Sequence, residues 1–207
     1  MTGIIDISPT ITEDLAVWPG DVSFSRSIQA DIASGANIRL SSFNATVHLG
    51  AHADAPNHYH RDGASIDRIA LDPYIGACEV ITVKTRTQLI GPDHCADALK
   101  RGVRRLLFKT LSQPDPMKFN TDFVAFSAAA MAAMGEAGVV LVGIDTPSVD
   151  PFDSKDLPAH QQLYKYGIRN LEGLVLAHVP DGAYELIALP LKLAGFDASP
   201  VRAILRS

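Results

Sequence analysis

The sequence predicts a mixed α/β fold, and three features of its patterning support this prediction. Short β-branched apolar runs recur along the chain, helical stretches separate some of them, and two early segments alternate apolar with polar residues. Apolar runs bounded by Gly, Pro and Asp are typical of buried strands. We therefore expect a mixed β-sheet core with flanking helices and a β-rich N-terminal third.

The apolar runs that we expect to form buried strands share their β-branched character and their Gly, Pro or Asp boundaries. They are residues 4–7, 80–83, 106–108, 123–126, 139–144, 174–177 and 184–189. Two earlier segments, 22–28 and 38–47, alternate apolar and polar residues, as half-exposed antiparallel strands do. The first third of the chain is therefore expected to contain antiparallel strands.

Helical patterns lie between some of these runs, at residues 92–101, 127–137 and 156–166. Ser127 is expected to cap the second helix. Pro158 falls in the first turn of the third, where its missing N–H does no harm. The apolar stretch 123–144 is not expected to span a membrane, because Glu136 near its middle would cost ~2.5 kcal/mol or more.

Length and composition narrow the class of protein. The chain has 207 residues and a formal net charge of −5, so we expect one domain spanning 1–207 and no nucleic-acid partner. No targeting segment is recognisable near the start. The two cysteines, Cys78 and Cys95, lack metal-binding spacing and are too few for a disulfide framework. A reducing, cytoplasmic location is expected.

Histidines concentrate in one short segment. The sequence holds seven histidines in all, and four of them lie between His48 and His60. The polar side chains that share parity in this segment are His48, His52, Asp54, His58 and His60. In an extended chain, residues two apart point to the same side, so His52 and Asp54 can converge on one ion. His48 can join them if the chain bends at Gly50.

These side chains predict a catalytic metal site. Imidazole nitrogens with a carboxylate suit Zn²⁺ or a neighbouring first-row ion such as Mn²⁺, Fe²⁺ or Co²⁺. Two histidines and one aspartate leave a coordination position open, which is typical of a catalytic ion. The alternative is a solvated histidine-rich loop or a set of hydrogen-bonded strand histidines.

The segment also resembles a family signature. Residues 48–58 are similar to the H-x-G-T-H-x-D-x-P-x-H motif of the cyclase-like metal-dependent hydrolases, and most similar to the bacterial kynurenine formamidases, with Ala51 where Thr is common. Further similar segments are 17–21, 143–150 and 160–172, so the resemblance covers nearly the whole chain. It implies a swivelling β/β/α fold and a homodimer.

The resemblance implies two Zn²⁺ ions per chain and assigns their ligands. The family pattern puts the first ion on the equivalents of His48, His52 and Asp54. Asp54 would be shared with a second ion that also takes His160 and Glu172. The residues alone do not single out the last two positions, since a helix histidine and a carboxylate beside a strand are usually solvated.

Two further roles follow from the resemblance. His58 matches the catalytic acid/base, which suits an imidazole because its ordinary pKa lies nearest neutrality. His60 is the competing choice, and His58 could instead be a metal ligand or a donor to one. Trp18, the only tryptophan, is expected to contact an aromatic substrate, although it could equally plug the core.

The resemblance thus implies an arylformamidase that hydrolyses N-formyl-L-kynurenine to L-kynurenine and formate in tryptophan degradation. A metal-activated water would be the nucleophile. No Gly-x-Ser-x-Gly elbow is present, so a serine-hydrolase route has no support. The alternatives are a related hydrolase of cyclic amides of the isatin type, and a metal-binding or ligand-binding module without turnover.

Overall fold

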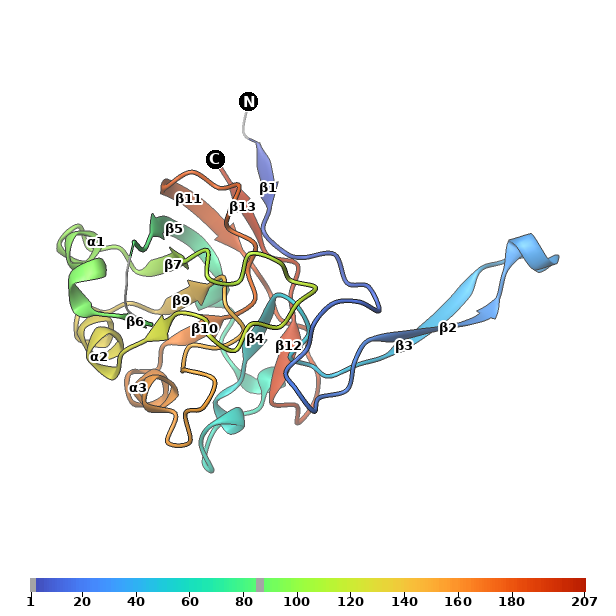
Figure 1. Ribbon diagram of the computed structural model, residues 1–207, viewed down its shortest axis with the longest axis horizontal. Helices are drawn as coiled ribbons and strands as arrows, with labels where there is room; N and C mark the ends of the chain where they lie inside the picture. Colours follow the sequence, from blue (N-terminus) through green and yellow to red (C-terminus); the bar gives the residue numbers. More distant parts are fainter. Residues whose placement is uncertain (1–2, 85–87) are drawn as a thin grey trace.

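A seven-stranded mixed sheet organises the protein (Figure 1). The computed structural model describes residues 3–84 and 88–207. The strand order is β1-β13-β11-β5-β7-β9-β10. In that order the strands are Ile4–Asp6, Ile204–Arg206, Gly182–Ile187, Ile75–Thr82, Arg105–Lys109, Leu141–Ile144 and Arg169–Leu171. Strands β5, β7, β9 and β10 run parallel, whereas β1, β13, β11 and β5 are antiparallel neighbours.

Both faces of the parallel half are covered, which explains its continuous apolar runs. Leu106 and Phe108 of β7 are fully buried in a cluster that includes Met131 and Leu163 from the helical side. The intervening Leu107 points the other way, into a second cluster that contains Ala53. The sheet is therefore the middle layer of the fold.

Helices form the outer layer on one side of the sheet (Figure 1). They are α1 (Ala96–Lys100), α2 (Ala128–Glu136) and α3 (Pro158–Tyr166). The Ser127 hydroxyl accepts the Ala130 N–H at 3.1 Å and so caps α2. A Cβ at Gly135 would lie 2.2 Å from the ring of Tyr166, so the absence of a side chain there lets α2 and α3 approach closely.

A two-stranded antiparallel sheet lies on the other side. It pairs β4 (His52–Asp54) with β12 (Ala198–Pro200). Alternation along β4 sends Ala53 into the core, so its two neighbours project from the opposite face of the strand. Another two-stranded sheet, which is parallel, pairs β6 (Leu89–Ile90) with β8 (Ala125–Phe126).

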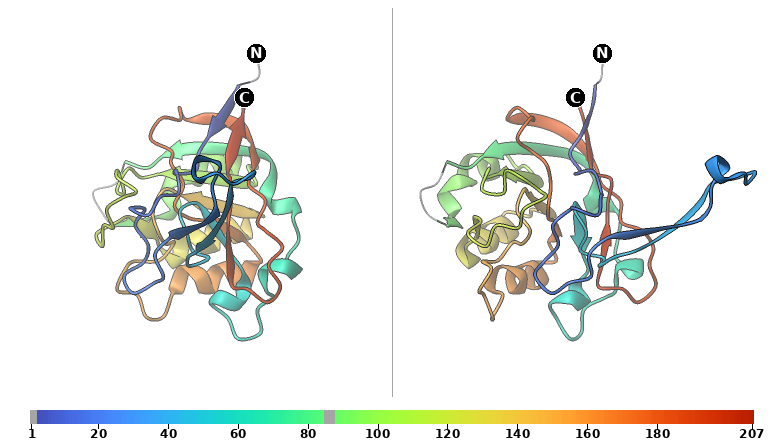
Figure 2. Two further views of the ribbon diagram at one scale, coloured as in Figure 1. Left: turned by 90° about the vertical axis from the view of Figure 1, so that its right-hand side faces the viewer. Right: turned by 45° about the vertical axis from the view of Figure 1, so that its right-hand side comes forward.

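A long hairpin projects away from this layered body (Figure 2). Strands β2 (Ser25–Ala30) and β3 (Leu40–Asn44) pair antiparallel, as the alternating segments predicted. Both strands are exposed along most of their length, including the apolar side chains of Ile28, Leu40 and Phe43. The hairpin therefore buries little of its own apolar surface within this chain.

Most expected elements are confirmed, but the expected strand at 174–177 is wrong. The strand next to β9 is β10 (Arg169–Leu171), and it ends before Gly173, whose φ is 64°. A Cβ at Gly173 would lie 2.2 Å from the carbonyl oxygen of Gly50, so the chain turns there against the segment that leads into β4. Leu174 and Leu176 lie in the loop that follows, and both are buried.

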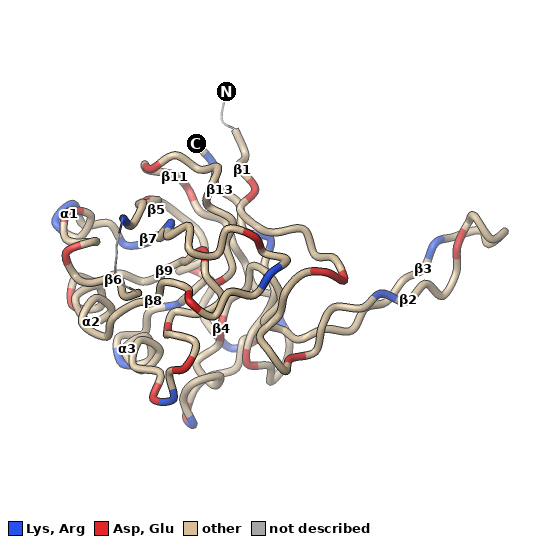
Figure 3. Tube along the Cα trace, in the orientation of Figure 1, with Lys and Arg blue, Asp and Glu red and all other residues tan. Residues whose placement is uncertain are grey.

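Five short 3-10 helices connect these elements among the described residues. They are Ile32–Ser34, Pro56–His58, Ile66–Arg68, Asp72–Tyr74 and Pro92–His94. Along the two described stretches of chain, we find no helix with the length and apolarity needed to cross a bilayer. Lys and Arg side chains are interspersed with Asp and Glu along the trace (Figure 3).

Candidate active site

Backbone pairing brings distant residues to β4. His52 and Glu172 form an isolated antiparallel bridge, in which each N–H donates to the other carbonyl at 3.1 and 3.0 Å. Asp54 pairs with Ala198 at the start of β12. Because His52 and Asp54 lie two residues apart on one strand, their side chains share a face, as the parity of the sequence predicted.

His48 reaches the same place because the chain bends at Gly50. The φ of Gly50 is 59°, a conformation that favours glycine. The bend puts Nδ1 of His48 at 3.0 Å from Oδ1 of Asp54. The carbonyl oxygen of Gly50 also lies 2.9 Å from Nδ1 of His52, which leaves Nε2 of that ring facing the carboxylates.

The extended alternation ends after Asp54. A 3-10 helix begins at Pro56 and ends at His58, so the shared parity of His58 and His60 with Asp54 does not place their side chains on the face of β4. His60 points elsewhere: its ring stacks on Tyr164 with centroids 3.5 Å apart and an interplanar angle of 9°. The structure thus places His58 and His60, the two candidates for the acid/base, in different surroundings.

His160 enters from the first turn of α3. The carboxylate of Asp150 accepts the backbone N–H groups of Ala159 and His160 at 2.8 and 3.0 Å, which caps the helix. The same carboxylate lies 2.7 Å from Nδ1 of His160. Nε2 of this imidazole is therefore directed towards Oδ2 of Asp54 at 3.5 Å and Oε1 of Glu172 at 3.6 Å.

The two oxygens of Asp54 face different imidazoles. Oδ1 lies 3.0 Å from His48 and 3.5 Å from His52, whereas Oδ2 lies 3.5 Å from His160. Glu172 mirrors this division, with Oε2 at 3.3 Å from His52 and Oε1 towards His160. A carboxylate that faces two groups of donors is suited to lie between two cations.

The donor set fits a divalent metal ion. Nε2 of His52 and Nε2 of His160 are buried and have no hydrogen-bond partner among the described residues. A buried polar atom left unpaired costs roughly 1–3 kcal/mol, and coordination of a cation removes that cost. The ligand atoms of His48, His52 and Asp54 all lie within 4.8 Å of one another, and so do those of Asp54, His58 and His160. Imidazole and carboxylate together favour a first-row divalent ion.

Electrostatics without an ion point the same way. Burial opposes ionisation of Asp54, but the neighbouring imidazoles of His160 and His48 outweigh this and hold its pKa well below the usual range. Burial opposes protonation of His48 and His160, yet their carboxylate partners raise the pKa of His48 to about 9 and that of His160 to about 10. Without an ion, the protons on His48 and His160 therefore supply the positive charge beside Asp54 that a metal ion would supply.

His58 stands beside these residues on the cavity side. Its ring centroid lies 4.3 Å from that of His48 and 6.1 Å from that of His160. The side chain is 36% exposed. Burial nevertheless lowers the pKa of His58 below its ordinary 6.5, so the imidazole is neutral at pH 7 and can accept a proton.

A cavity of ≈ 650 Å³ opens onto the histidines. Trp18 lines it, with its ring centroid 5.3 Å from Phe119, 6.3 Å from Phe123 and 5.0 Å from Phe152. The first two contacts are edge-to-face and the third is tilted. Trp18 is thus both a wall of the cavity and a member of a partly buried aromatic cluster.

Three further polar side chains contact the histidines and carboxylates of the site, and the sequence indicated only one of them, Asp150, as a residue that shapes a loop near the site. Asn170 is fully buried and donates from Nδ2 to Asp54 Oδ2 at 2.6 Å and to Glu172 Oε1 at 3.1 Å. Asp150 fixes His160, as described above. Asp197 contacts His48 at 3.0 Å. Asn170 lies two residues before Glu172, so strand parity could have suggested it; no local signal marks Asp197.

Comparisons with known proteins agree with this geometry. The family model described as putative cyclase matches residues 5–151. A curated kynurenine formamidase of Polaromonas naphthalenivorans is 46% identical over 203 residues, which cover 98% of this chain and 90% of that protein. One of Delftia acidovorans is 43% identical over 202 residues, covering 98% and 96%.

Solved structures share the fold. One described as a potential metal-dependent hydrolase with cyclase activity has a TM-score of 0.85 and 27% identity, covering 100% of this chain and 98% of that one. An isatin hydrolase bound to the product analogue thioisatinate also has a TM-score of 0.85, at 17% identity and with 100% and 92% covered. The second likeness concerns the fold alone. The extent of the family match and the full-length relatives show that the chain belongs to the putative cyclase family.

Proposed function

We propose that this protein is a metal-dependent arylformamidase that hydrolyses N-formyl-L-kynurenine to L-kynurenine and formate, a step of tryptophan degradation. Three imidazoles and two carboxylates face one another beside a cavity that Trp18 lines, and this juxtaposition supports the proposal most directly. Relatives named kynurenine formamidase, 40–46% identical over 98% of the chain, support the choice of substrate.

We infer that the site takes two Zn²⁺ ions, with Mn²⁺ or another first-row ion as the alternative. His48, His52 and Asp54 would hold one ion, and Asp54, His160 and Glu172 the other. A bound divalent ion would supply two effects: it lowers the pKa of a bound water towards about 7, and it polarises the formyl carbonyl. Asp150 and Asn170 contribute by holding these ligands in place.

His58 performs the proton transfers in this scheme. Its neutral imidazole accepts a proton from the attacking water and returns it to the departing aniline nitrogen. The return step matters because an unprotonated anilide is a poor leaving group. The low pKa and the partial exposure of His58 towards the cavity both support this role.

Trp18 selects the aromatic substrate. A ring packed against an indole gains about 0.5–1.5 kcal/mol beyond simple area burial. N-formylkynurenine carries its formamide directly on such a ring, so packing against Trp18 would present the formyl carbon to the histidines.

We further propose that residues 1–207 act as one domain and that two copies associate. Exposed apolar side chains on the hairpin support this, since Phe43 is 67% exposed and Leu40 51%. Large exposed apolar patches are typical of protein interfaces. Sedimentation of the wild type and of Phe43→Asp checks the association of two copies, because the variant should shift towards monomer.

We also propose a reducing, cytoplasmic location. The free, buried Cys78 and Cys95 support it.

A substrate comparison on metal-loaded protein tests the function. Turnover of N-formylkynurenine should exceed that of isatin and of an aliphatic formamide, and elemental analysis should find zinc. Faster hydrolysis of isatin would instead identify a cyclic-amide hydrolase. Metal binding without turnover of any of these amides would identify a binding module.

A further inference from the structure

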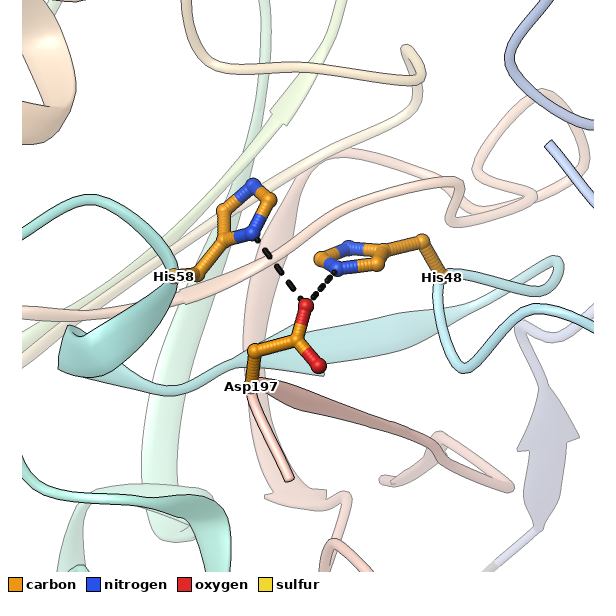
Figure 4. Close-up of side chains that lie close together, drawn as sticks. All are labelled: His48, His58 and Asp197. Atoms are coloured by element: carbon orange, nitrogen blue, oxygen red, sulfur yellow. Dashed lines mark hydrogen bonds and ion pairs between the residues drawn. The ribbon is translucent and has the colours of Figure 1, made fainter. Parts of the chain in front are cut away.

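One carboxylate oxygen faces two imidazoles at the rim of the cavity (Figure 4). Oδ2 of Asp197 lies 3.0 Å from Nε2 of His48 and 3.5 Å from Nδ1 of His58. Asp197 immediately precedes β12, and its carbonyl oxygen accepts the Ala55 N–H at 2.8 Å. Its position is therefore fixed by the same strand pair that carries Asp54.

The contact with His48 fixes which ring nitrogen faces the metal ligands. An N–H at one end of a neutral imidazole leaves the lone pair at the other. Because Nε2 of His48 donates to Asp197, Nδ1 faces Asp54 with its lone pair when the ring is neutral. His160 with Asp150 and His52 with the Gly50 carbonyl show the same arrangement. Such outer partners set the orientation and basicity of histidine ligands.

The contact with His58 has a parallel effect on the proton-transferring ring. Nδ1 points to Asp197, and Nε2 points away from that carboxylate (Figure 4). A proton on Nδ1 therefore leaves the Nε2 lone pair as the base. The nearby carboxylate also attracts the imidazolium that forms when Nε2 takes a proton.

We propose that Asp197 is a positioning residue that sets the tautomers of His48 and His58 together through one oxygen atom. The inference rests on the proposed function, because it assigns His58 the proton transfers of that hydrolysis. It adds that one carboxylate serves a metal ligand and the acid/base at once.

The ¹⁵N resonances of His58 in zinc-loaded protein test the orientation without any substrate. The wild type should carry its proton on Nδ1. Asp197→Ala should move the population towards the Nε2–H form, whereas Asp197→Asn, which retains an oxygen acceptor, should move it less. An unchanged tautomer in Asp197→Ala overturns the proposal.

A double-mutant cycle tests the kinetic consequence. Asp197→Ala should lower kcat about 10–100-fold, the usual effect of removing an orienting partner, with a smaller change in KM. With zinc held at saturation, so that the contact with His48 does not limit kcat, the same substitution in a His58→Ala background should change kcat less than about twofold, because the second ring on which it acts is gone. Equal losses in both backgrounds mean that Asp197 acts independently of His58, which contradicts the proposal.

Chelator competition tests the contact with His48. Asp197→Ala should weaken zinc binding about 10–100-fold. Asp67→Asn is the matched control, because Asp67 accepts the Gly195 N–H and so supports the same loop, while its other contacts among the described residues are with Ser65 and Arg68. It should retain wild-type zinc affinity and kcat. Equal weakening in the control and in Asp197→Ala shows a general effect on the loop and overturns the inference.

Failure of the proposed function is distinguishable from failure of this inference. If the zinc-loaded wild type hydrolyses no amide, the proposed function is rejected. The tautomer of His58 and the zinc affinity of Asp197→Ala then still test the role of Asp197. If the wild type is active and neither measurement responds to Asp197→Ala, the role of Asp197 alone is rejected.

Discussion

The carboxylate of Asp150 holds His160 at two points. Oδ2 lies 2.7 Å from the imidazole Nδ1 and accepts the backbone N–H of the same residue at 3.0 Å. One buried aspartate thus starts helix α3 and orients the histidine in its first turn. The start of α3 and the orientation of the His160 imidazole therefore depend on the same carboxylate.

Substitution of Asp150 should therefore weaken metal binding. Asp150→Asn removes the charge that holds His160, so zinc affinity should fall about 10–100-fold in chelator competition. Ser127→Ala is the matched control: it removes the cap of α2, should cost about 1 kcal/mol of stability, and should leave zinc affinity unchanged. Similar zinc affinities for the two variants would argue that Asp150 only caps the helix.

The proton-transfer role separates His58 from His60. His58→Ala should keep its metal and lose roughly 10²–10⁴-fold in kcat, the usual contribution of a general acid/base. His60→Ala should lose far less, since the ring of His60 stacks on Tyr164 outside the site. Steady-state kinetics with parallel metal analysis checks both. Loss of metal in His58→Ala would make it a ligand instead.

The number of metal ions bound per chain should show whether Asp54 is shared between two ions. The wild type should bind about two ions per chain, because the two oxygens of Asp54 face separate donor groups. Asp54→Ala should lose both ions, and His160→Ala should lose one. Elemental analysis after dialysis measures this directly. Wild-type stoichiometry in both His160→Ala and Glu172→Ala would leave only the His48, His52 and Asp54 group.

The metal-free protein should lose stability as the pH rises. The pKa values of His48 and His160, about 9 and about 10, exceed the ordinary 6.5 of an unfolded chain. Their charged forms therefore stabilise the fold fully below pH 6.5, and this contribution is lost as the pH rises through about 9 to 10.

Thermal unfolding of chelator-treated protein between pH 7 and pH 10 measures this effect. The Tm should fall over that range, and the fall should be smaller in the double variant His48→Gln, His160→Gln. Zinc-loaded protein should lack this contribution, since its imidazoles bind metal in the neutral form. Identical pH profiles for wild type and the double variant would contradict the charged state of these histidines.

Trp18 should affect selectivity more than metal binding. Trp18→Ala should lower kcat/KM for N-formylkynurenine about tenfold or more, because a ring packed against the indole gains about 0.5–1.5 kcal/mol in addition to the area it buries. Trp18→Phe, which keeps an aromatic wall against Phe152, should lose less. Activity on an aliphatic formamide should barely change in either variant. Equal losses on both substrates would assign Trp18 to the aromatic cluster and the fold.

The local part of the site could be predicted from the sequence. His52 and Asp54 lie two apart on one strand, and the bend at Gly50 brings in His48, so short-range geometry suffices. Strand parity does not extend past Asp54, because Pro56 begins a 3-10 helix, and His58 at its end lines the cavity. His60 shares parity with His48, His52 and Asp54, yet its ring stacks on Tyr164.

The residues that lie far from the histidine segment in the sequence reach the site through tertiary pairing of the backbone. Glu172 reaches the site through its backbone bridge to His52, and family resemblance was needed to suggest it. Asp197 has no local signal at all, since only the pairing of β12 with β4 places it beside His48. The apolar run at 174–177 resembles a strand because it is apolar and Leu174 and Leu176 are buried, but its backbone is a loop outside every strand of the described residues.

The pairing of β4 with β12 has a consequence for the order in which the chain is made. His48 and Asp197 are 149 positions apart. At a synthesis rate of about 5–20 residues per second, roughly 7–30 s separate the appearance of the histidine segment from that of its carboxylate partner. Throughout this interval a nascent chain carries His48, His52 and Asp54 without the strand that fixes them. Assembly of the complete histidine and carboxylate cluster is therefore a late event of biogenesis, after β12 has been translated and has docked.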